Sequence, residues 1–138
     1  MIPVTPKLTV DAVIILSGKI VLIKRKRPPY QGKFALPGGF VDIGETTEEA
    51  VAREVLEETG LSIEIVKLLG VYSNPSRDPR GHTVSVCYLT KGKGNPKADS
   101  DADDIGLFDP NDLPGLAFDH NMIIDRARDE IDGVLSKM

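Results

Sequence analysis

The sequence predicts a single α/β domain of 138 residues. Three observations predict it: several apolar, β-branched runs are typical of strands, two segments have helical features, and the length suits one domain. Apolar residues make up 41% of the chain and charged residues 28%, as in folded globular proteins. Because no repeat or linker divides the sequence, we expect one domain over residues 1–138.

The charge balance argues against nucleic acid as a partner, because the formal net charge is -4 and phosphate neutralisation needs an excess of Lys and Arg. The single cysteine, Cys87, lies among alternating apolar residues, which favours a core position over a nucleophile. The N-terminal residues lack the pattern of a signal peptide, and no stretch is long enough to cross a bilayer. We therefore expect a cytoplasmic protein with no membrane partner.

The first part of the chain is predicted to form a hairpin. Residues 8–16 and 19–26 are strand-like, and Ser17-Gly18 makes the turn between them. Residues 34–36 continue as a short extended piece. They lead into Pro37-Gly38-Gly39, which we expect to be a functional loop because glycine adopts backbone conformations closed to other residues.

The clearest helix begins at Thr46 and ends at Gly60. Glu49 stands three residues after Thr46, as in a capping box, and Gly60 is a natural left-handed C-cap. Further strands are expected at residues 63–72, 82–90 and 105–108, with a polar surface loop at residues 91–104. Apolar spacing over residues 121–135 predicts one C-terminal helix packed on the sheet.

The helix at residues 46–59 has an anionic face. Glu54, Glu57 and Glu58 fall within an arc of about 100°, and the adjacent apolar side is formed by Val51, Ala52, Val55, Leu56 and Thr59. A solvated acidic surface is the simpler interpretation. However, the three carboxylates repel one another, and two of them lie at the carbonyl end of the helix dipole. A bound divalent cation offsets both effects, and clustered oxygen ligands suit Mg²⁺ or Mn²⁺.

The segment GFVDIGETTEEAVAREVLEETGL, residues 39–61, resembles the Nudix hydrolase signature at every fixed position. The matching residues are Gly39, Glu45, Arg53, Glu54, Val55, Glu57, Glu58, Gly60 and Leu61. The resemblance implies an α/β/α sandwich with a mixed sheet, a homodimer, and Mg²⁺ as the cofactor with Mn²⁺ as a substitute.

The resemblance also implies roles for individual residues. The metal ligands would be Glu54 and Glu58 directly, Glu57 through water, and the backbone carbonyl of Gly38. Arg53 and Glu45 would orient these carboxylates or a water molecule.

Other segments narrow the resemblance to the ADP-ribose pyrophosphatase branch. These segments are KFALPGGFVDIGE, YSNPSRDPRGHTVSV and LAFDH. They imply hydrolysis of ADP-ribose, or of a related nucleoside diphosphate sugar, with AMP and ribose 5-phosphate formed from ADP-ribose. Substrate contacts are expected from Arg77 and Arg80, from Arg25 or Arg27, and beside Gly39, since guanidinium groups bind phosphate in a bidentate manner. The alternative for Arg77 and Arg80 is a polar turn in which Asp78 pairs with an arginine.

The general base is left open among Asp104, Glu45 and Glu57. In similar enzymes an acidic residue of a late loop takes this role, and Asp101, Asp103 and Asp104 precede Phe108 here. His82 and His120 are expected to be structural or to contact substrate.

Two alternative functions remain. One is a house-cleaning nucleoside triphosphate pyrophosphatase, and the other is a non-catalytic module that senses ADP-ribose.

Overall fold

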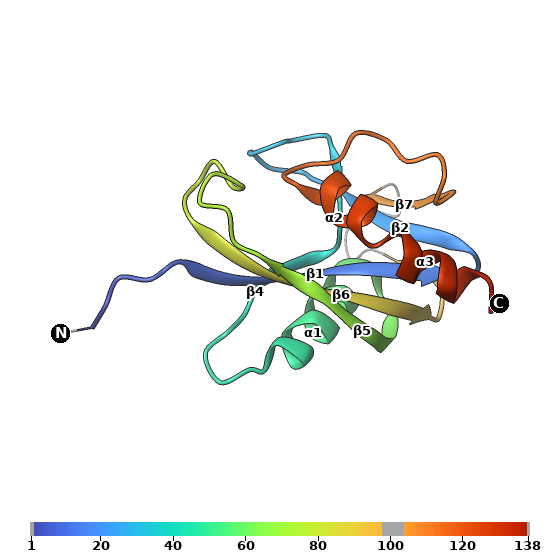
Figure 1. Ribbon diagram of the computed structural model, residues 1–138, viewed down its shortest axis with the longest axis horizontal. Coiled ribbons are helices and arrows are strands. Elements are labelled where there is room, and N and C mark those ends of the chain that lie inside the picture. The colour runs from blue at the N-terminus through green and yellow to red at the C-terminus, as the bar shows by residue number, and fades with distance from the viewer. Residues whose placement is uncertain (1, 98–103, 138) are drawn as a thin grey trace.

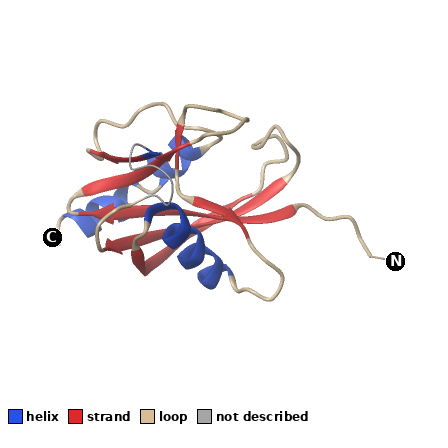
Figure 2. Ribbon diagram, turned by 180° about the vertical axis from the view of Figure 1, so that it is seen from behind, coloured by secondary structure: helices blue, strands red, loops and turns tan. Residues whose placement is uncertain are grey.

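The computed structural model describes residues 2–97 and 104–137. A central sheet is covered on one face by α1 (Thr47–Thr59) and on the other by α2 (His120–Arg126) and α3 (Arg128–Leu135), as Figure 1 shows. The view from behind (Figure 2) shows α1 on the opposite side of the strands from the C-terminal helices. The α/β/α sandwich implied by the resemblance is therefore confirmed.

Within the described residues the sheet contains seven strands, which are β1 (Lys7–Leu16), β2 (Lys19–Lys24), β3 (Phe34–Ala35), β4 (Gly38–Phe40), β5 (Ser62–Tyr72), β6 (Thr83–Lys93) and β7 (Ile105–Phe108). The main order is β3-β2-β1-β6-β5, while β4 pairs with β1 and β7 pairs with β2. The β1–β6 pair is parallel and the remaining strand pairs are antiparallel, so the sheet is mixed as expected.

β1 is the central strand and is buried on both faces. Val10, Ala12 and Ile14 belong to the apolar cluster under α1, whereas Val13 and Ile15 belong to the cluster under α2 and α3. Successive side chains of a strand point to opposite faces of the sheet, so one strand supplies both cores. This explains why its sequence is a nearly continuous apolar run.

The ends of α1 follow the sequence prediction. Thr46 accepts a hydrogen bond from the Glu49 N–H, the Glu49 side chain accepts one from the Thr46 N–H, and Gly60 closes the helix with φ 73°. The predicted apolar side is only partly right. Val51 and Val55 are buried, but Ala52 is exposed and Leu56 is 55% exposed. The buried stripe of α1 is therefore narrower than expected.

Two other predictions differ from the structure. The Gly38-Gly39 segment was predicted to be a loop, but it belongs to the short strand β4, which pairs with β1. The predicted single C-terminal helix is two helices that meet at Ala127, whose φ of -96° and ψ of 8° leave the helical region. The break lets both helices place isoleucines on the sheet, with Ile124 and Ile131 fully buried.

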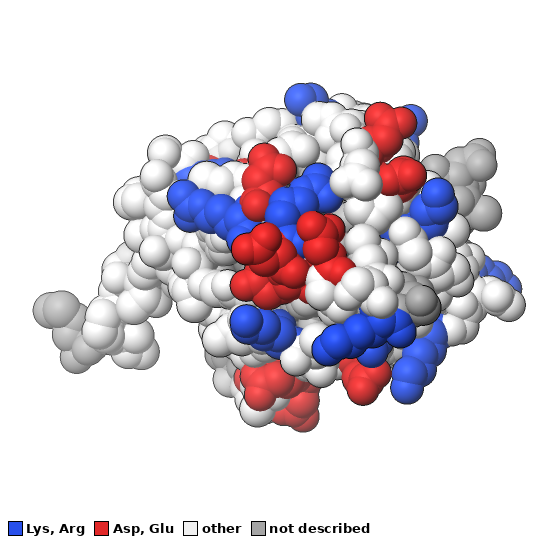
Figure 3. Space-filling model, turned by 45° about the vertical axis from the view of Figure 1, so that its right-hand side comes forward, with Lys and Arg blue, Asp and Glu red and all other residues white. Residues whose placement is uncertain are grey.

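The surface carries charges of both signs. Figure 3 shows acidic and basic side chains side by side over the face that it presents. Within the described part of the chain, no helix combines the length and apolarity that crossing a bilayer requires. The predicted acidic residues Asp101 and Asp103 lie outside the described residues.

Candidate active site

The site begins where the C-terminal half of α1 meets β4. The Gly38 N–H donates a hydrogen bond to Glu58 Oε2 at 3.0 Å. Gly39 packs so closely on the helix that a Cβ there would lie 2.5 Å from Glu54 Cδ. Burial, and then the neighbouring Glu54 carboxylate, raise the pKa of Glu58 to about 8. The two glycines therefore allow a strand to lie directly against two crowded carboxylates.

Arg53 organises the carboxylates around it. Its guanidinium donates two hydrogen bonds to Glu45, at 2.7 and 2.8 Å, and one to Glu54 at 2.9 Å. It also donates to the Phe40 carbonyl at 3.1 Å, and to Glu57 at 3.4 Å. The hydrogen bonds from Arg53 lower the pKa of Glu45 to about 2. Arg53 thus links α1 to the loop before it, as an orienting residue would.

The carboxylates of α1 differ in how well they suit a divalent cation. Glu54 and Glu58 are mostly buried, and among the described residues no Lys or Arg forms an ion pair with Glu58. Glu57 differs, because its side chain is 57% exposed and faces Arg53. Among the described residues, no three His, Cys, Asp or Glu side chains form a ready metal cluster. Two crowded carboxylates in a partly dehydrated position nevertheless fit a hard cation, which would neutralise them.

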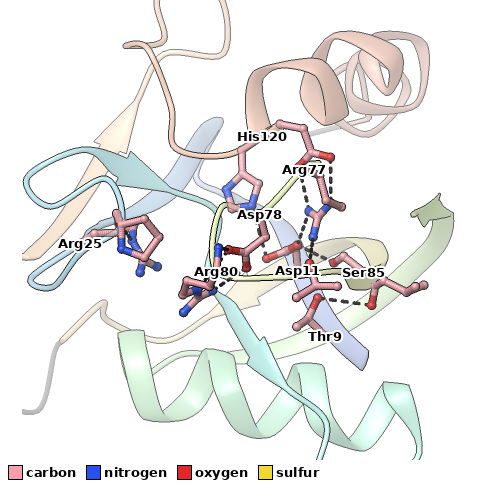
Figure 4. Close-up of polar contacts among 12 residues, drawn as sticks. Thr9, Asp11, Arg25, Arg77, Asp78, Arg80, Ser85 and His120 are labelled. Atoms are coloured by element: carbon pink, nitrogen blue, oxygen red, sulfur yellow. Dashed lines mark hydrogen bonds and ion pairs between the residues drawn. The ribbon is translucent and has the colours of Figure 1, made fainter. Parts of the chain in front are cut away.

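A hollow of about 80 Å³ lies beside these residues. Its lining includes Glu58, Gly38 and Gly39 together with Arg25 and Arg80. Figure 4 shows Arg25 and Arg80 between the α1 and α2 sides of the molecule. Carboxylates and guanidinium groups therefore border the same small space.

Arg25 and Arg80 are both oriented by neighbouring groups. The Arg25 Nε donates to the Pro29 carbonyl at 2.7 Å, and no carboxylate of the described chain lies within ion-pair distance of it. Burial, and then the charge of Arg80, lower the pKa of Arg25. Arg80 donates two hydrogen bonds to the Asp78 carboxylate, at 3.1 and 2.8 Å. The Asp78–Arg80 pair was expected as an alternative to substrate contact, but Arg80 also lines the hollow.

Behind the hollow lies a buried polar network. Arg77 forms a two-pronged pair with Asp119, at 2.9 and 2.8 Å, and lies 3.8 Å from Asp11. Ser85 donates to Asp11, and His120 Nε2 lies 3.6 Å from the same carboxylate. Burial raises the pKa of Asp11, although His120, Ser85 and Arg77 oppose this effect, and burial lowers the pKa of His120. A lowered pKa favours the neutral form of the His120 imidazole. The hydrogen bond at 3.0 Å agrees with this form, because His120 Nδ1 accepts it from the Leu36 N–H.

The remaining predicted site residues lie elsewhere. Arg27 is exposed and is not among the residues that line the hollow. Asp104 forms an ion pair with Lys26 at 2.5 Å and does not line the hollow either. Arg77 contributes to the lining, but its side chain is only 5% exposed and its guanidinium is held by Asp119. Of the predicted arginines, the structure therefore brings Arg25 and Arg80 to the open side of the site.

Sequence reasoning gave no role to Asp11, Phe118 or Asp119. Asp11 was detectable, because an acidic residue within the apolar run of residues 8–16 contradicts the requirements of a buried strand. Phe118 and Asp119 lie in the LAFDH segment, where nothing in the sequence shows which loop they contact.

Comparison with known proteins identifies the family. The family model described as the NUDIX domain matches residues 5–127. The chain belongs to the Nudix hydrolase family. Over 120 residues it is 55% identical to a Methanocaldococcus jannaschii protein named ADP-ribose pyrophosphatase, a match that covers 86% of this chain and 71% of that protein. The carboxylate helix α1 thus carries the Nudix signature.

Two solved Nudix structures are also similar. A MutT/nudix family protein from Enterococcus faecalis matches with a TM-score of 0.84 and 34% identity, over 96% of this chain and 64% of that one. The NUDIX domain of Shewanella oneidensis NrtR, solved in complex with ADP ribose, matches with a TM-score of 0.77 and 33% identity, over 92% and 89% of the two chains. The Nudix fold of this chain is therefore shared with a domain that binds ADP-ribose.

Coverage differs among the curated relatives. A Bacillus subtilis protein named putative 8-oxo-dGTP diphosphatase is 46% identical over 72 residues, which are 51% of this chain and 46% of that protein. This match is shorter than the match to the M. jannaschii protein, which spans 120 residues. The similarity of this Nudix chain to the M. jannaschii protein therefore extends over more of its length.

Proposed function

We propose that this chain hydrolyses the diphosphate linkage of ADP-ribose, or of a related nucleoside diphosphate sugar, and releases AMP and ribose 5-phosphate from ADP-ribose. The observation that carries the proposal is the 55% identity to the M. jannaschii protein named ADP-ribose pyrophosphatase. The site chemistry supports it, because a diphosphate is an anion that fits between the guanidinium groups of Arg25 and Arg80 and a metal-binding helix.

The donor set suggests how the site would work. Glu54 and Glu58, with Glu57 and the Gly38 carbonyl, would hold a divalent cation, whose charge stabilises the phosphoryl group during transfer. Arg53 keeps Glu54 in place by the hydrogen bond at 2.9 Å. Arg25 and Arg80, which line the same hollow as Glu58, would orient the diphosphate. The protein's contribution is chiefly positioning and charge, as in other phosphoryl transfers.

Of the three candidate bases, Glu57 fits best. Both oxygens of Glu45 are hydrogen-bonded to Arg53, and with a pKa of about 2 it is a weak proton acceptor. Asp104 is paired with Lys26 away from the hollow. Glu57 does not line the hollow itself, but it precedes Glu58, which does; its side chain is 57% exposed and has only the longer contact of 3.4 Å to Arg53. We therefore propose Glu57 as the residue that accepts the proton of the attacking water.

A substrate panel tests the proposal. The purified protein would be incubated with ADP-ribose, other nucleoside diphosphate sugars and nucleoside triphosphates, with Mg²⁺ and with EDTA, and the products identified by mass. We expect AMP and ribose 5-phosphate from ADP-ribose, and no turnover in EDTA. Preferential release of pyrophosphate from a triphosphate would instead favour the house-cleaning function. Tight binding of ADP-ribose without any product would favour a sensing module.

Three further expectations belong to the same proposal. We propose Mg²⁺ as the physiological ion, with Mn²⁺ as a substitute, because the candidate ligands are hard oxygen donors. We also propose a homodimer and a cytoplasmic location. Light scattering during size-exclusion chromatography measures the subunit number, and metal reconstitution of EDTA-treated protein ranks the ions by activity.

A further inference from the structure

Phe118 has an unusual backbone at the edge of the hollow. Its φ is 54°, in the left-handed region that residues with a Cβ rarely adopt. Its ring nevertheless has defined neighbours: the guanidinium carbon of Arg25 lies 4.9 Å from the ring centroid, and that of Arg80 lies 5.6 Å away. Tyr30 packs against the same ring, edge to face, with centroids 4.9 Å apart. One aromatic ring therefore contacts both arginines that line the open side of the site.

The residues around Phe118 fix this conformation. On one side, the Ala117 N–H donates to the Phe34 carbonyl at 2.9 Å. On the other side, Asp119 receives the two hydrogen bonds from Arg77, and His120 accepts the Leu36 N–H. Strained backbone persists where surrounding contacts over-determine it, and such strain is found at functional sites.

These contacts join three loops. Arg77 belongs to the segment between β5 and β6 that also carries Arg80, and Leu36 precedes the Gly38 that contacts Glu58. The Arg77–Asp119 pair is buried, with side chains 5% and 12% exposed, so solvent screens it little. The pair therefore ties the Arg80 loop to the segment that presents the Phe118 ring.

We propose that Phe118 is a positioning residue, whose ring sets the spacing and direction of Arg25 and Arg80 toward the substrate diphosphate, and that the Arg77–Asp119 pair holds this ring in place. The inference rests on the proposed function for the identity of the substrate. It gives Arg77 a supporting role in place of direct substrate contact. Cation–π contact with the ring orients a guanidinium without neutralising it. Arg25 therefore keeps its charge for an anionic ligand, while Arg80 shares its guanidinium with Asp78.

Phe118→Gly removes the ring without adding backbone strain. Glycine adopts a φ of 54° without steric cost, so the variant removes the ring and relieves the backbone at once. Because the arginines lose their orientation but the metal helix is untouched, we expect the KM for ADP-ribose to rise about tenfold while kcat stays within about threefold. Phe118→Tyr keeps the ring and is expected to restore KM to within about twofold of wild type. A Phe118→Gly variant with wild-type KM, or with the whole loss in kcat, overturns the proposal.

Arg77→Lys tests the supporting pair, and Val134→Ala is its control. Lysine keeps the charge but cannot make the two-pronged contact to Asp119, so KM is expected to rise in the same direction. Val134 is a buried residue of α3 and does not line the hollow, so Val134→Ala lowers stability and leaves KM unchanged. Equal KM values for Arg77→Lys and Val134→Ala would show that Arg77 only stabilises the fold.

A binding measurement separates this inference from the proposed function. If wild-type protein leaves ADP-ribose intact, the proposed substrate is wrong, and calorimetric binding of inorganic pyrophosphate to the metal-free protein becomes the test. We expect Phe118→Gly to weaken that binding about tenfold relative to wild type and Phe118→Tyr. Equal affinities, or no pyrophosphate binding by wild type, overturn the positioning role.

Discussion

Replacing Glu58 with glutamine should make the metal-free protein more stable and inactive. The pKa of Glu58 is raised from 4.5 to about 8, chiefly by burial and then by Glu54. The pKa of this carboxyl is higher in the folded chain than in the unfolded chain. Folding is therefore most favourable at a pH where the carboxyl is protonated in both states, and the free energy of unfolding falls as the pH rises and the unfolded chain releases the proton first. The folded protein therefore loses stability between pH 4.5 and about 8.

The magnitude follows from the same pKa values. The full linkage would be about 5 kcal/mol above pH 8, and we expect about 1–3 kcal/mol after relaxation and water entry. Glutamine has no proton to lose, and its side-chain oxygen can still accept the Gly38 N–H. Glu58→Gln should therefore be more stable than wild type by this amount at about pH 8, and by little at about pH 5.

The assay is urea unfolding of both proteins in EDTA at the two pH values, followed by the same experiment in Mg²⁺. Ligand binding to the folded state stabilises it, so wild type should gain stability in Mg²⁺ while Glu58→Gln gains little and shows almost no turnover. Glu57→Gln is the matched control for stability in EDTA, because the Glu57 side chain is 57% exposed and its neutralisation changes stability little. If Glu58→Gln is less stable than wild type at about pH 8 in EDTA, the ionised Glu58 carboxylate does not destabilise the folded protein, and the reasoning is refuted.

Three other predictions concern Gly39, Arg53 and Cys87. Gly39→Ala would place a Cβ 2.5 Å from Glu54 Cδ, so kcat should fall about a hundredfold in a protein whose circular dichroism is unchanged. Arg53→Lys cannot hold Glu45 and Glu54 together, so kcat should fall at least about tenfold with little change in the urea midpoint. Burial raises the pKa of Cys87, so its thiol should react with a disulfide reagent only in denaturant, and reaction of the native protein would contradict its buried position.

Local rules were sufficient for several elements. The capping box of Thr46 and Glu49 and the left-handed Gly60 placed both ends of α1, because the bonds that end a helix are made within a few residues. The hairpin turn at Ser17-Gly18 was predicted for the same reason. The C-terminal helix was predicted less well, since the break at Ala127 is set by packing of two short helices on a curved sheet.

The candidate site divides in the same way. Glu54, Glu57 and Glu58 could be proposed as metal ligands from the sequence because their spacing on one helix fixes their common face. Arg25 and Arg77 were expected to act alike, but Arg25 borders the hollow with its charge available, whereas Arg77 is buried against Asp119. The spacing of residues in the sequence does not show that Arg77, and not Arg25, forms an ion pair with Asp119, which is 42 residues away from Arg77.

The sequence by itself determined the carboxylate helix, its two ends and the family signature, because each depends on residues within about one to six helical turns of one another. Only the tertiary structure decided which arginines border the hollow, why Asp11 lies inside a strand, and how Phe118 is held between loops. These features depend on contacts between distant segments, and burial changes the energies of charged groups by amounts that no local pattern specifies.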